Sequence, residues 1–287
     1  MNGDASVLEL RCEATRLTLD PHRGGAIREF DWGGHAIFRP TAANAGDDPL
    51  DMACFPMAPY VNRIACGRFS FGGRAVRLRR NWNQDPHPLH GYGWRARWSV
   101  VAASASRATV RFDGGADEWP WRYRCEQCFE LLPDGVSIEL SIANLGDTMM
   151  PAMLGLHPYF PDAARAHLQA QLPRIWLTDR AALPLEETGT PPAWGFDASR
   201  AINALPLDHC FSGWNGNATL RWPDRTVTIC ATRCNHLHVY APVGRDFFCI
   251  EPQTAAVGAL NRDTAEVTAV APGERLAIRV QFVVGAA

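Results

Sequence analysis

Hydrophobic and polar residues alternate with a period of two along much of this chain, and Gly, Pro and Asp interrupt the alternation. Residues 122–132 alternate in this way, and after the turn residues Pro133-Asp134-Gly135 the alternation continues over residues 136–142. A period of two places successive side chains on opposite faces of an extended strand. Asp-Gly is also a favoured hairpin turn, so the pattern predicts an antiparallel hairpin across these residues.

Three further segments follow the same rule. Residues 68–78 predict a hairpin that turns at Gly72-Gly73, and residues 220–229 predict one that turns at Pro223-Asp224. Residues 276–282 carry one apolar face and predict a final strand.

Helical periodicity is poor throughout the chain. The best helical candidate is the short, alanine-rich segment 162–171, and the clearest breaks between strands are predicted loops at residues 41–50 and 188–198. No polar linker divides the sequence. We therefore predict a mostly β fold, with residues 1–287 forming a single domain that is one large antiparallel β-sandwich.

Composition narrows the classes of function. The chain is 47% hydrophobic, enough for a sizeable core, and its formal net charge of −2 argues against a dedicated nucleic-acid-binding protein. No apolar run approaches the roughly 18 residues of a membrane span, and the first ten residues lack the features of a signal peptide. We expect a cytoplasmic monomer or homodimer with no membrane or nucleic-acid partner.

All 28 basic residues are arginine. The absence of lysine excludes a Schiff-base lysine, a pyridoxal-phosphate lysine and the lysine of a P-loop. No Gly-x-Gly-x-x-Gly motif supports a dinucleotide site. Catalysis would therefore rest on His, Asp, Glu, Arg, Cys or a metal, and we expect no cofactor.

The nine cysteines are an odd number in a chain without an export signal, which predicts reduced thiols. Cys125 and Cys128 fall on opposite faces of a predicted strand, so they cannot share one metal ion. A second group offers zinc-type ligands in a spacing that matches no common zinc pattern: Cys230, Cys234, His236 and His238. We predict no metal site.

Five short clusters combine ionisable residues with Gly, Pro or aromatic residues. They are Pro59-Tyr60-Val61-Asn62-Arg63-Ile64, His87-Pro88-Leu89-His90-Gly91-Tyr92-Gly93-Trp94, Gly155-Leu156-His157-Pro158-Tyr159-Phe160, Leu207-Asp208-His209-Cys210-Phe211 and Ile250-Glu251-Pro252-Gln253-Thr254. Turn capping or loop bracing would explain any single cluster. Together they supply a carboxylate, two histidines, an arginine and an aspartate, which can move protons in both directions without a cofactor. Arg and Asp can also hold vicinal hydroxyls by charge-assisted hydrogen bonds.

In this order, the five clusters resemble the aldose 1-epimerase (galactose mutarotase) family, whose fold is a large β-sandwich, the supersandwich. The matching segments are Asn62-Arg63-Ile64, Leu89-His90-Gly91 with Asn81 upstream, His157-Pro158-Tyr159-Phe160, Leu207-Asp208-His209, and Glu251-Pro252-Gln253 with Asn261 downstream. Tyr92 and Leu156 depart from the Gly and Asn of many members. We expect both departures beside the sugar site, where they would affect substrate choice more than chemistry.

The resemblance implies an isomerase that interconverts the α and β anomers of a free aldose, a monosaccharide. It implies that Glu251 takes the proton of the C1 hydroxyl, that His157 protonates the ring oxygen, and that His90 hydrogen-bonds near that oxygen. It also implies substrate-binding roles for Asn62, Arg63, Tyr159, Asp208 and Gln253. Because Glu251 must be ionised while His157 is charged, we expect a bell-shaped pH–rate profile.

Other classes of function remain open. A non-catalytic sugar-binding protein would need Arg63 and Asp208 but not the Glu251–His157 pair. A sugar-phosphate mutarotase on the same fold would need clustered arginines near the site, and the nearest run, at residues 77–80, is explained by a solvated strand end. A glycoside hydrolase would need two carboxylates, which Asp208 and Glu251 could supply.

Overall fold

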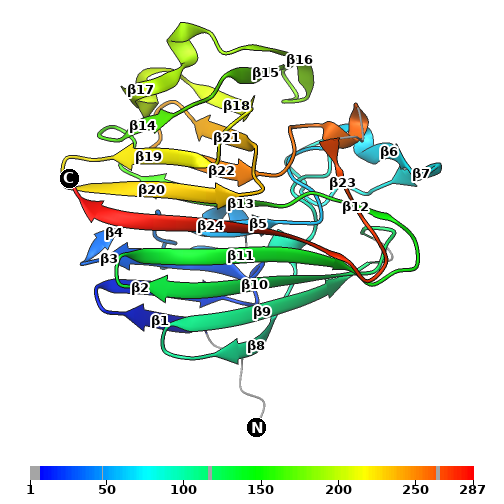
Figure 1. Cartoon of the computed structure of the whole chain (residues 1–287), viewed down its shortest axis with the longest axis horizontal. Coiled ribbons are helices and arrows are strands. Elements are labelled where there is room, and N and C mark those ends of the chain that lie inside the picture. Colours follow the sequence, from blue (N-terminus) through cyan, green and yellow to red (C-terminus); the bar gives the residue numbers. More distant parts are fainter. Residues whose placement is uncertain (1–6, 47, 116–117, 263–265) are drawn as a thin grey trace.

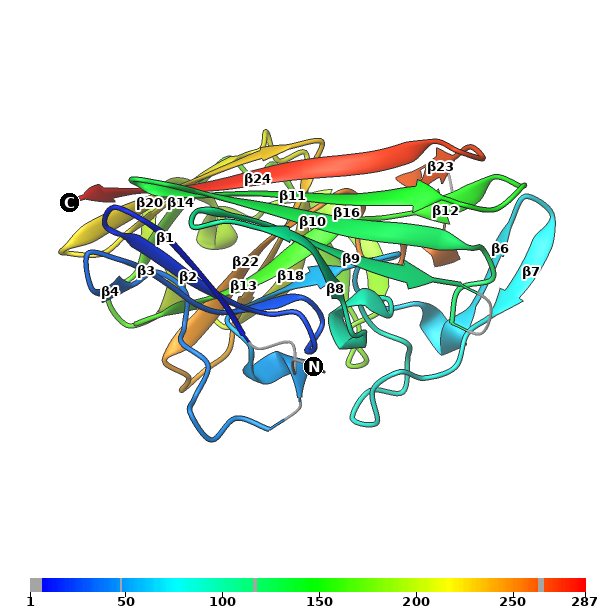
Figure 2. The ribbon, with the colours of Figure 1, turned by 90° about the horizontal axis from the view of Figure 1, so that it is seen from below.

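Two large antiparallel sheets stack as two layers in the computed structural model, which describes residues 7–46, 48–115, 118–262 and 266–287 (Figures 1 and 2). The eleven-stranded sheet contains, in spatial order, β1 (Leu8–Cys12), β2 (Thr15–Asp20), β3 (Ala26–Trp32), β5 (Cys54–Met57), β13 (Gly155–Pro161), β22 (Phe247–Gln253), β21 (His236–Ala241), β18 (Leu207–Ser212), β15 (Arg174–Thr178) and β16 (Pro184–Gly189), with β4 (His35–Ala36) paired to β3. The nine-stranded sheet contains β17 (Phe196–Ala201), β14 (His167–Ala170), β19 (Asn217–Arg221), β20 (Arg225–Thr232), β24 (Arg275–Ala286), β11 (Gly135–Asn144), β10 (Tyr123–Leu132), β9 (Arg107–Gly114) and β8 (Ser99–Ala103). The predicted mostly β, antiparallel sandwich is confirmed.

Two small sheets and six short 3-10 helices complete the described residues. The small sheets are β6 (Arg68–Phe71) with β7 (Arg74–Arg77), and β12 (Met150–Ala152) with β23 (Thr268–Val270). The 3-10 helices are η1 (Pro49–Asp51), η2 (Ala65–Gly67), η3 (Gly93–Arg95), η4 (Pro192–Trp194), η5 (Ile202–Ala204) and η6 (Ala259–Asn261). Within the described ranges, no helix has the length and apolar character needed to cross a membrane.

Aromatic residues fill the space between the two layers. Phe160 of β13 stacks on Phe248 of β22 at 5.5 Å between ring centroids, and both rings are fully buried. Phe38 contacts Phe160 edge-on at 5.4 Å and Phe282 of β24 at 4.9 Å, so it joins the two sheets. Edge-to-face pairs of this kind are favoured by the ring quadrupoles, in addition to the burial of their apolar area.

The predicted hairpins are confirmed. Residues 123–132 of β10 pair with residues 135–144 of β11, and the side chain of Cys125 is buried while that of Cys128 is exposed, as opposite faces require. The β6–β7 hairpin turns at Gly72 and Gly73, whose φ angles of 55° and 76° lie in the left-handed region that a two-residue turn of this hand requires.

Two expectations from the sequence were wrong. The helical candidate at residues 162–171 contains strand β14 instead, because its side chains alternate between exposed and buried and its backbone pairs with β17 and β19. The predicted loop at residues 188–198 contains the end of β16, the helix η4 and the start of β17. Strands β14 and β17 form through pairing with each other across about 30 residues, which local propensity does not encode, whereas β16 extends a hairpin with its neighbour β15.

The outer face of the eleven-stranded sheet is the face that carries polar side chains. In β13, Leu156 and Phe160 are buried toward the core, while His157 and Tyr159 alternate with them and line a cavity on the other side. The loops between β4 and β5 and between β7 and β8 cover this face on the side away from the nine-stranded sheet (Figure 2).

Candidate active site

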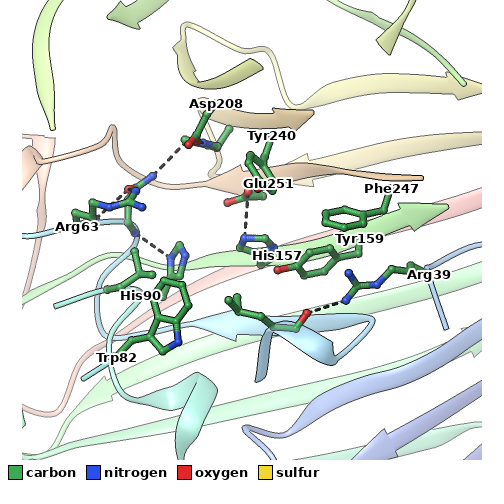
Figure 3. Close-up of a pocket in the computed structure, with 14 residues that line it drawn as sticks. Arg39, Arg63, Trp82, His90, His157, Tyr159, Asp208, Tyr240, Phe247 and Glu251 are labelled. Carbon is green, nitrogen blue, oxygen red and sulfur yellow. Dashed lines mark hydrogen bonds and ion pairs between the residues drawn. The ribbon is translucent and has the colours of Figure 1, made fainter. Parts of the chain in front are cut away.

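A cavity of about 240 Å³ opens on the outer face of the eleven-stranded sheet (Figure 3). Its floor comes from the neighbouring strands β13, β22, β21 and β18, and its walls come from the loops that follow β4, β5 and β7. Ligand sites typically measure about 300–1,000 Å³, so this cavity suits a small metabolite. The lining residues are Arg39, Leu50, Asn62, Arg63, Trp82, Leu89, His90, His157, Tyr159, Asp208, His238, Tyr240, Phe247 and Glu251.

His157, Glu251 and His238 lie in one row across three adjacent strands. The register between β13 and β22 pairs Tyr159 with Cys249, and two residues further along it places His157 opposite Glu251. The register between β22 and β21 pairs Glu251 directly with His238. Opposite residues in neighbouring strands share a face of the sheet, so three ionisable side chains meet at the centre of the cavity floor.

The imidazole of His157 packs against two aromatic rings. Phe55, its neighbour across β5, lies 4.5 Å away between centroids, and Tyr159, two residues along β13, lies 4.8 Å away, both with nearly parallel ring planes. Nε2 of His157 lies 3.3 Å from Oε1 of Glu251. The two stacks fix the plane of the ring, so this nitrogen is held toward the carboxyl group.

Glu251 is 2% exposed, and its second oxygen is also held. Nε2 of Gln253, two residues along β22, donates to Oε2 of Glu251 at 3.1 Å. Burial raises the pKa of Glu251 to about 7, although the positive charge of His238 opposes this shift. A carboxyl group that titrates near neutral pH is suited to general acid–base catalysis.

Burial also controls the protonation of the two histidines beside Glu251. It lowers the pKa of His157 to about 3. Burial acts in the same direction on His238, but Glu251 and Asp208 outweigh it and raise the pKa of that histidine well above 6.5. The positive charge therefore lies on His238, and His157 and Glu251 together hold one proton between about pH 3 and about pH 7. The sequence alone had suggested a charge on His157.

Asn62 and His90 hold each other in the cavity wall. The backbone N–H of Asn62 donates to Nδ1 of His90 at 3.2 Å, and the backbone N–H of His90 donates to the carbonyl of Asn62 at 3.0 Å. Because Nδ1 accepts a hydrogen bond, Nε2 carries the ring proton and is available as a donor. Burial lowers the pKa of His90 well below 6.5, so the ring stays neutral.

The backbone around His90 requires a glycine. Asn62 and His90 have φ angles of 56° and 57°, and Gly91 has a φ angle of 74°. A Cβ atom at Gly91 would lie 2.1 Å from the carbonyl oxygen of Ala58. The Asn81 amide donates to the carbonyls of Leu89 and Gly91, so it fixes the same loop from outside the cavity.

Arg63 is oriented by a carboxylate that the sequence analysis did not single out. Nε of Arg63 donates to Oδ2 of Asp85 at 2.8 Å, and Asp85 is 5% exposed. The other oxygen of Asp85 accepts from the backbone N–H of His87 at 2.8 Å. A buried, charge-assisted hydrogen bond of this kind holds a guanidinium in one direction.

We expect Asp85→Asn to lower kcat/KM of the protein for its substrate by about tenfold. The loss should appear chiefly in KM, because Arg63 would no longer be held in place by a hydrogen bond between charged groups, which contributes about 1.5–3 kcal/mol. Asp113→Asn is the matched control, since it changes the same group in an exposed pair with Arg124 on the nine-stranded sheet. Steady-state kinetics of both variants would check the prediction. Equal KM values for the two variants would contradict it.

Asp208 and His238 form a second ion pair, in which His238 is buried and the side chain of Asp208 is 48% exposed. Nε2 of His238 lies 2.8 Å from Oδ1 of Asp208, and Nδ1 lies 3.3 Å from Nδ2 of Asn62. Burial alone would raise the pKa of Asp208, but the hydrogen bond and charge of His238 lower it to about 2. Asp208 is therefore a fixed negative acceptor at neutral pH.

The family model of the aldose 1-epimerases matches residues 20–283, a range that includes every residue lining the cavity. The chain belongs to the aldose 1-epimerase family.

Individual proteins support this assignment. The uncharacterized protein YphB of Escherichia coli K12 is 29% identical over 276 residues, which cover 91% of this chain and 94% of YphB. A solved E. coli K12 protein, assigned provisionally as an aldose 1-epimerase, has a TM-score of 0.91 at 27% identity and covers 98% of this chain and 99% of its own. A galactose mutarotase-like protein from Clostridium acetobutylicum has a TM-score of 0.85 at 18% identity over 100% of both chains, which shows the fold alone.

Most residues that the family resemblance singled out do line the cavity. Seven of the eight predicted residues are among its lining residues: Asn62, Arg63, His90, His157, Tyr159, Asp208 and Glu251. Gln253, predicted to bind substrate, does not line the cavity; it is fully buried and orients Glu251. Tyr92 and Leu156 also do not line it, and Leu156 faces the core. The two departures from the family pattern therefore do not narrow the cavity.

Several residues that line the cavity are not predicted from the sequence. His238 was assigned only to the Cys and His group of residues 230–238, and its alternation with Tyr240 on one strand was the available signal. Arg39 and Phe247 lie outside every cluster, and no local pattern marks them. Trp82 is one of several tryptophans whose faces suit a sugar ring, and the sequence does not distinguish it from those of the core.

The predicted absence of a metal site was argued from cysteine and histidine spacing. Within the described residues, the group at 230–238 does not converge, and three other side chains do: His157, Cys249 and Glu251 place ligand atoms within 4.8 Å of one another. Burial raises the pKa of Cys249 well above its usual range, which keeps the thiol protonated. Metals bind the thiolate, so this chemistry does not favour a metal here, and we assign none.

Proposed function

We propose that this protein is an aldose 1-epimerase that interconverts the α and β anomers of an aldose. The observation that carries the proposal is the buried pair of His157 and Glu251, 3.3 Å apart at the centre of a cavity that suits one sugar ring. Ring opening requires one proton to leave the C1 hydroxyl and one to reach the ring oxygen. A pair that shares a single mobile proton can do both.

In the proposed reaction, ionised Glu251 takes the proton of the C1 hydroxyl while protonated His157 gives its proton to the ring oxygen. The bond between C1 and the ring oxygen breaks, and the C1 carbonyl forms. Rotation about C1–C2 presents the opposite face of the carbonyl, and the same two transfers in reverse close the ring. The reactive state differs from the more stable protonation state of this pair, with neutral His157 and protonated Glu251, only by transfer of one proton across the 3.3 Å between Oε1 and Nε2.

The remaining residues would bind and orient the sugar. Neutral His90 offers an Nε2–H donor to the oxygen that gains charge as the ring opens. Arg63 and Asp208, each fixed by a buried partner, would hold the hydroxyl groups as donor and acceptor. Trp82 offers an apolar face to one side of the ring.

We expect kcat/KM for mutarotation to fall as the pH rises through about 7, because Glu251, with a pKa of about 7, then loses the shared proton. His157 has a pKa of about 3, so it is neutral there and has no proton to give; below about pH 3 the pair gains a second proton and lacks a base. The profile is therefore bell-shaped, with an alkaline limb of about tenfold per pH unit. A constant rate from about pH 5 to about pH 9 would contradict this assignment.

Anomer interconversion itself tests the proposed function. Crystalline α-glucose, α-galactose, xylose, arabinose and fucose would each be dissolved with and without protein, and the anomeric NMR signals or optical rotation followed. Acceleration of at least one sugar supports the proposal. Binding of a sugar without acceleration would overturn it in favour of a non-catalytic sugar-binding protein.

A further inference from the structure

Arg39 is the one cavity-lining cation without a carboxylate partner within residues 7–46, 48–115, 118–262 and 266–287. Of the other charged groups in the cavity, Arg63 is paired with Asp85, and Asp208 is paired with His238. The acidic Glu251 lies beside His157. Between about pH 3 and about pH 7, His157 and Glu251 together hold one proton and carry no net charge, so the charge of Arg39 remains uncompensated.

The guanidinium of Arg39 is held in place by contacts that use only part of its hydrogen-bonding capacity. Its carbon lies 4.0 Å from the ring centroid of Tyr159 and 4.8 Å from that of Phe247. Nη2 donates to the carbonyls of Leu50 at 2.7 Å and Met52 at 3.0 Å. A guanidinium has five N–H donors, and within the part of the chain that the structure describes those on Nε and Nη1 have no protein acceptor, so they stay available to a ligand in the cavity.

The position of Arg39 in the cavity indicates which carbon of a bound sugar it would face. His157 stacks on Tyr159, and the guanidinium of Arg39 lies over the Tyr159 ring. The three side chains therefore form a line that leads away from Glu251 (Figure 3). Arg63 and Asp208 lie at the opposite end of the cavity (Figure 3). If the ring oxygen lies at His157 and C1 at Glu251, as the proposed function requires, then C5, the other neighbour of the ring oxygen, lies toward Arg39.

We infer that Arg39 binds an anionic group on the C5 substituent of the sugar, so that the substrate class is an acidic aldose. This inference rests on the proposed function. A preorganised arginine in a partly dehydrated pocket recognises carboxylates and phosphates strongly. A monoanionic carboxylate, as in a hexuronic acid, matches the single uncompensated charge, whereas a phosphate dianion would leave one negative charge unbalanced.

The test compares mutarotation of α-glucose, glucuronic acid, galacturonic acid and glucose 6-phosphate at one ionic strength. We expect kcat/KM for a hexuronic acid to exceed that for glucose by about tenfold or more, the size of one charged hydrogen bond. Arg39→Gln should bring this ratio close to one, and Arg39→Lys should leave an intermediate ratio, because a point charge keeps the attraction without the planar donors. Arg279→Gln, on the nine-stranded sheet, controls for the change in net charge.

The outcomes separate this inference from the proposed function. No acceleration of any sugar would overturn the proposed function itself. Equal rates for glucose and the hexuronic acids, reduced alike by Arg39→Gln, would overturn only the inference. The role of Arg39 would then be to hold the segment of Leu50 and Met52 in place through its hydrogen bonds to their carbonyls. A preference for glucose 6-phosphate over both uronic acids would support an anion site at Arg39 and overturn its assignment to a carboxylate.

Discussion

Glu251→Gln is expected to abolish most of the proposed mutarotase activity, with kcat falling by about 10²–10⁴-fold, the usual contribution of a positioned acid or base. The amide is the same size as the carboxyl group, and its oxygen can still accept the hydrogen bond from Gln253. It cannot take a proton from the C1 hydroxyl. His157→Asn should cause a loss of similar size, and the double variant should lose little more than either single variant, because the two residues act as a unit.

The stability of Glu251→Gln gives this prediction a second readout. Burial raises the pKa of Glu251 to about 7, so the ionised carboxylate is stabilised less in the folded than in the unfolded chain. The wild type therefore loses stability as the pH rises from about 4.5 to about 7, and the amide does not. We expect the variant to be at least as stable as the wild type above pH 7 in thermal unfolding.

Glu130→Gln is the matched control for the loss of activity, because it changes an exposed carboxylate paired with Arg107 on the nine-stranded sheet. Its kcat should match that of the wild type. If Glu251→Gln kept more than about a tenth of the wild-type kcat, a role for Glu251 as the base would be excluded.

Phe55→Ala is expected to lower the free energy of unfolding by about 3–5 kcal/mol, the usual effect of emptying a fully buried aromatic site. Phe55 is 0% exposed, and it packs against Trp94 as well as His157. Because whole domains are stable by only about 5–15 kcal/mol, this one change would remove a large part of the total. Urea unfolding followed by tryptophan fluorescence would measure it.

Phe55 is expected to affect kcat as well as the free energy of unfolding. Its ring forms one of the two stacks that fix the imidazole of His157, so Phe55→Leu, which keeps most of the volume, should still lower kcat. Phe282→Ala is the control, since it empties an equally buried site between the sheets and away from the cavity. Its stability should fall by a similar amount while kcat of the folded protein stays unchanged. Equal kcat for Phe55→Leu and the wild type would contradict a role in orienting His157.

Local patterns were sufficient for most of the strands. The β10–β11 hairpin and the turn at Gly72 and Gly73 were predicted because alternation and turn chemistry act over neighbouring residues. Prediction failed at residues 162–171, where a short run with weak propensity became strand β14 through pairing with β17 and β19. Such pairing involves partners about 30 and 50 residues away, and short segments take the conformation their neighbours allow.

By itself, the sequence determined the class of fold, the family and most of the polar residues that line the cavity, because short motifs and a period of two mark each of them. Only the tertiary structure decided that His238 pairs with Asp208, that Gln253 orients Glu251 rather than lining the cavity, and that Arg39 enters the cavity. It also decided that the positive charge beside Glu251 lies on His238 and not on His157. Strand order and register bring distant residues into one row, where burial and the neighbouring charges together set each pKa, and no local pattern in the chain records either effect.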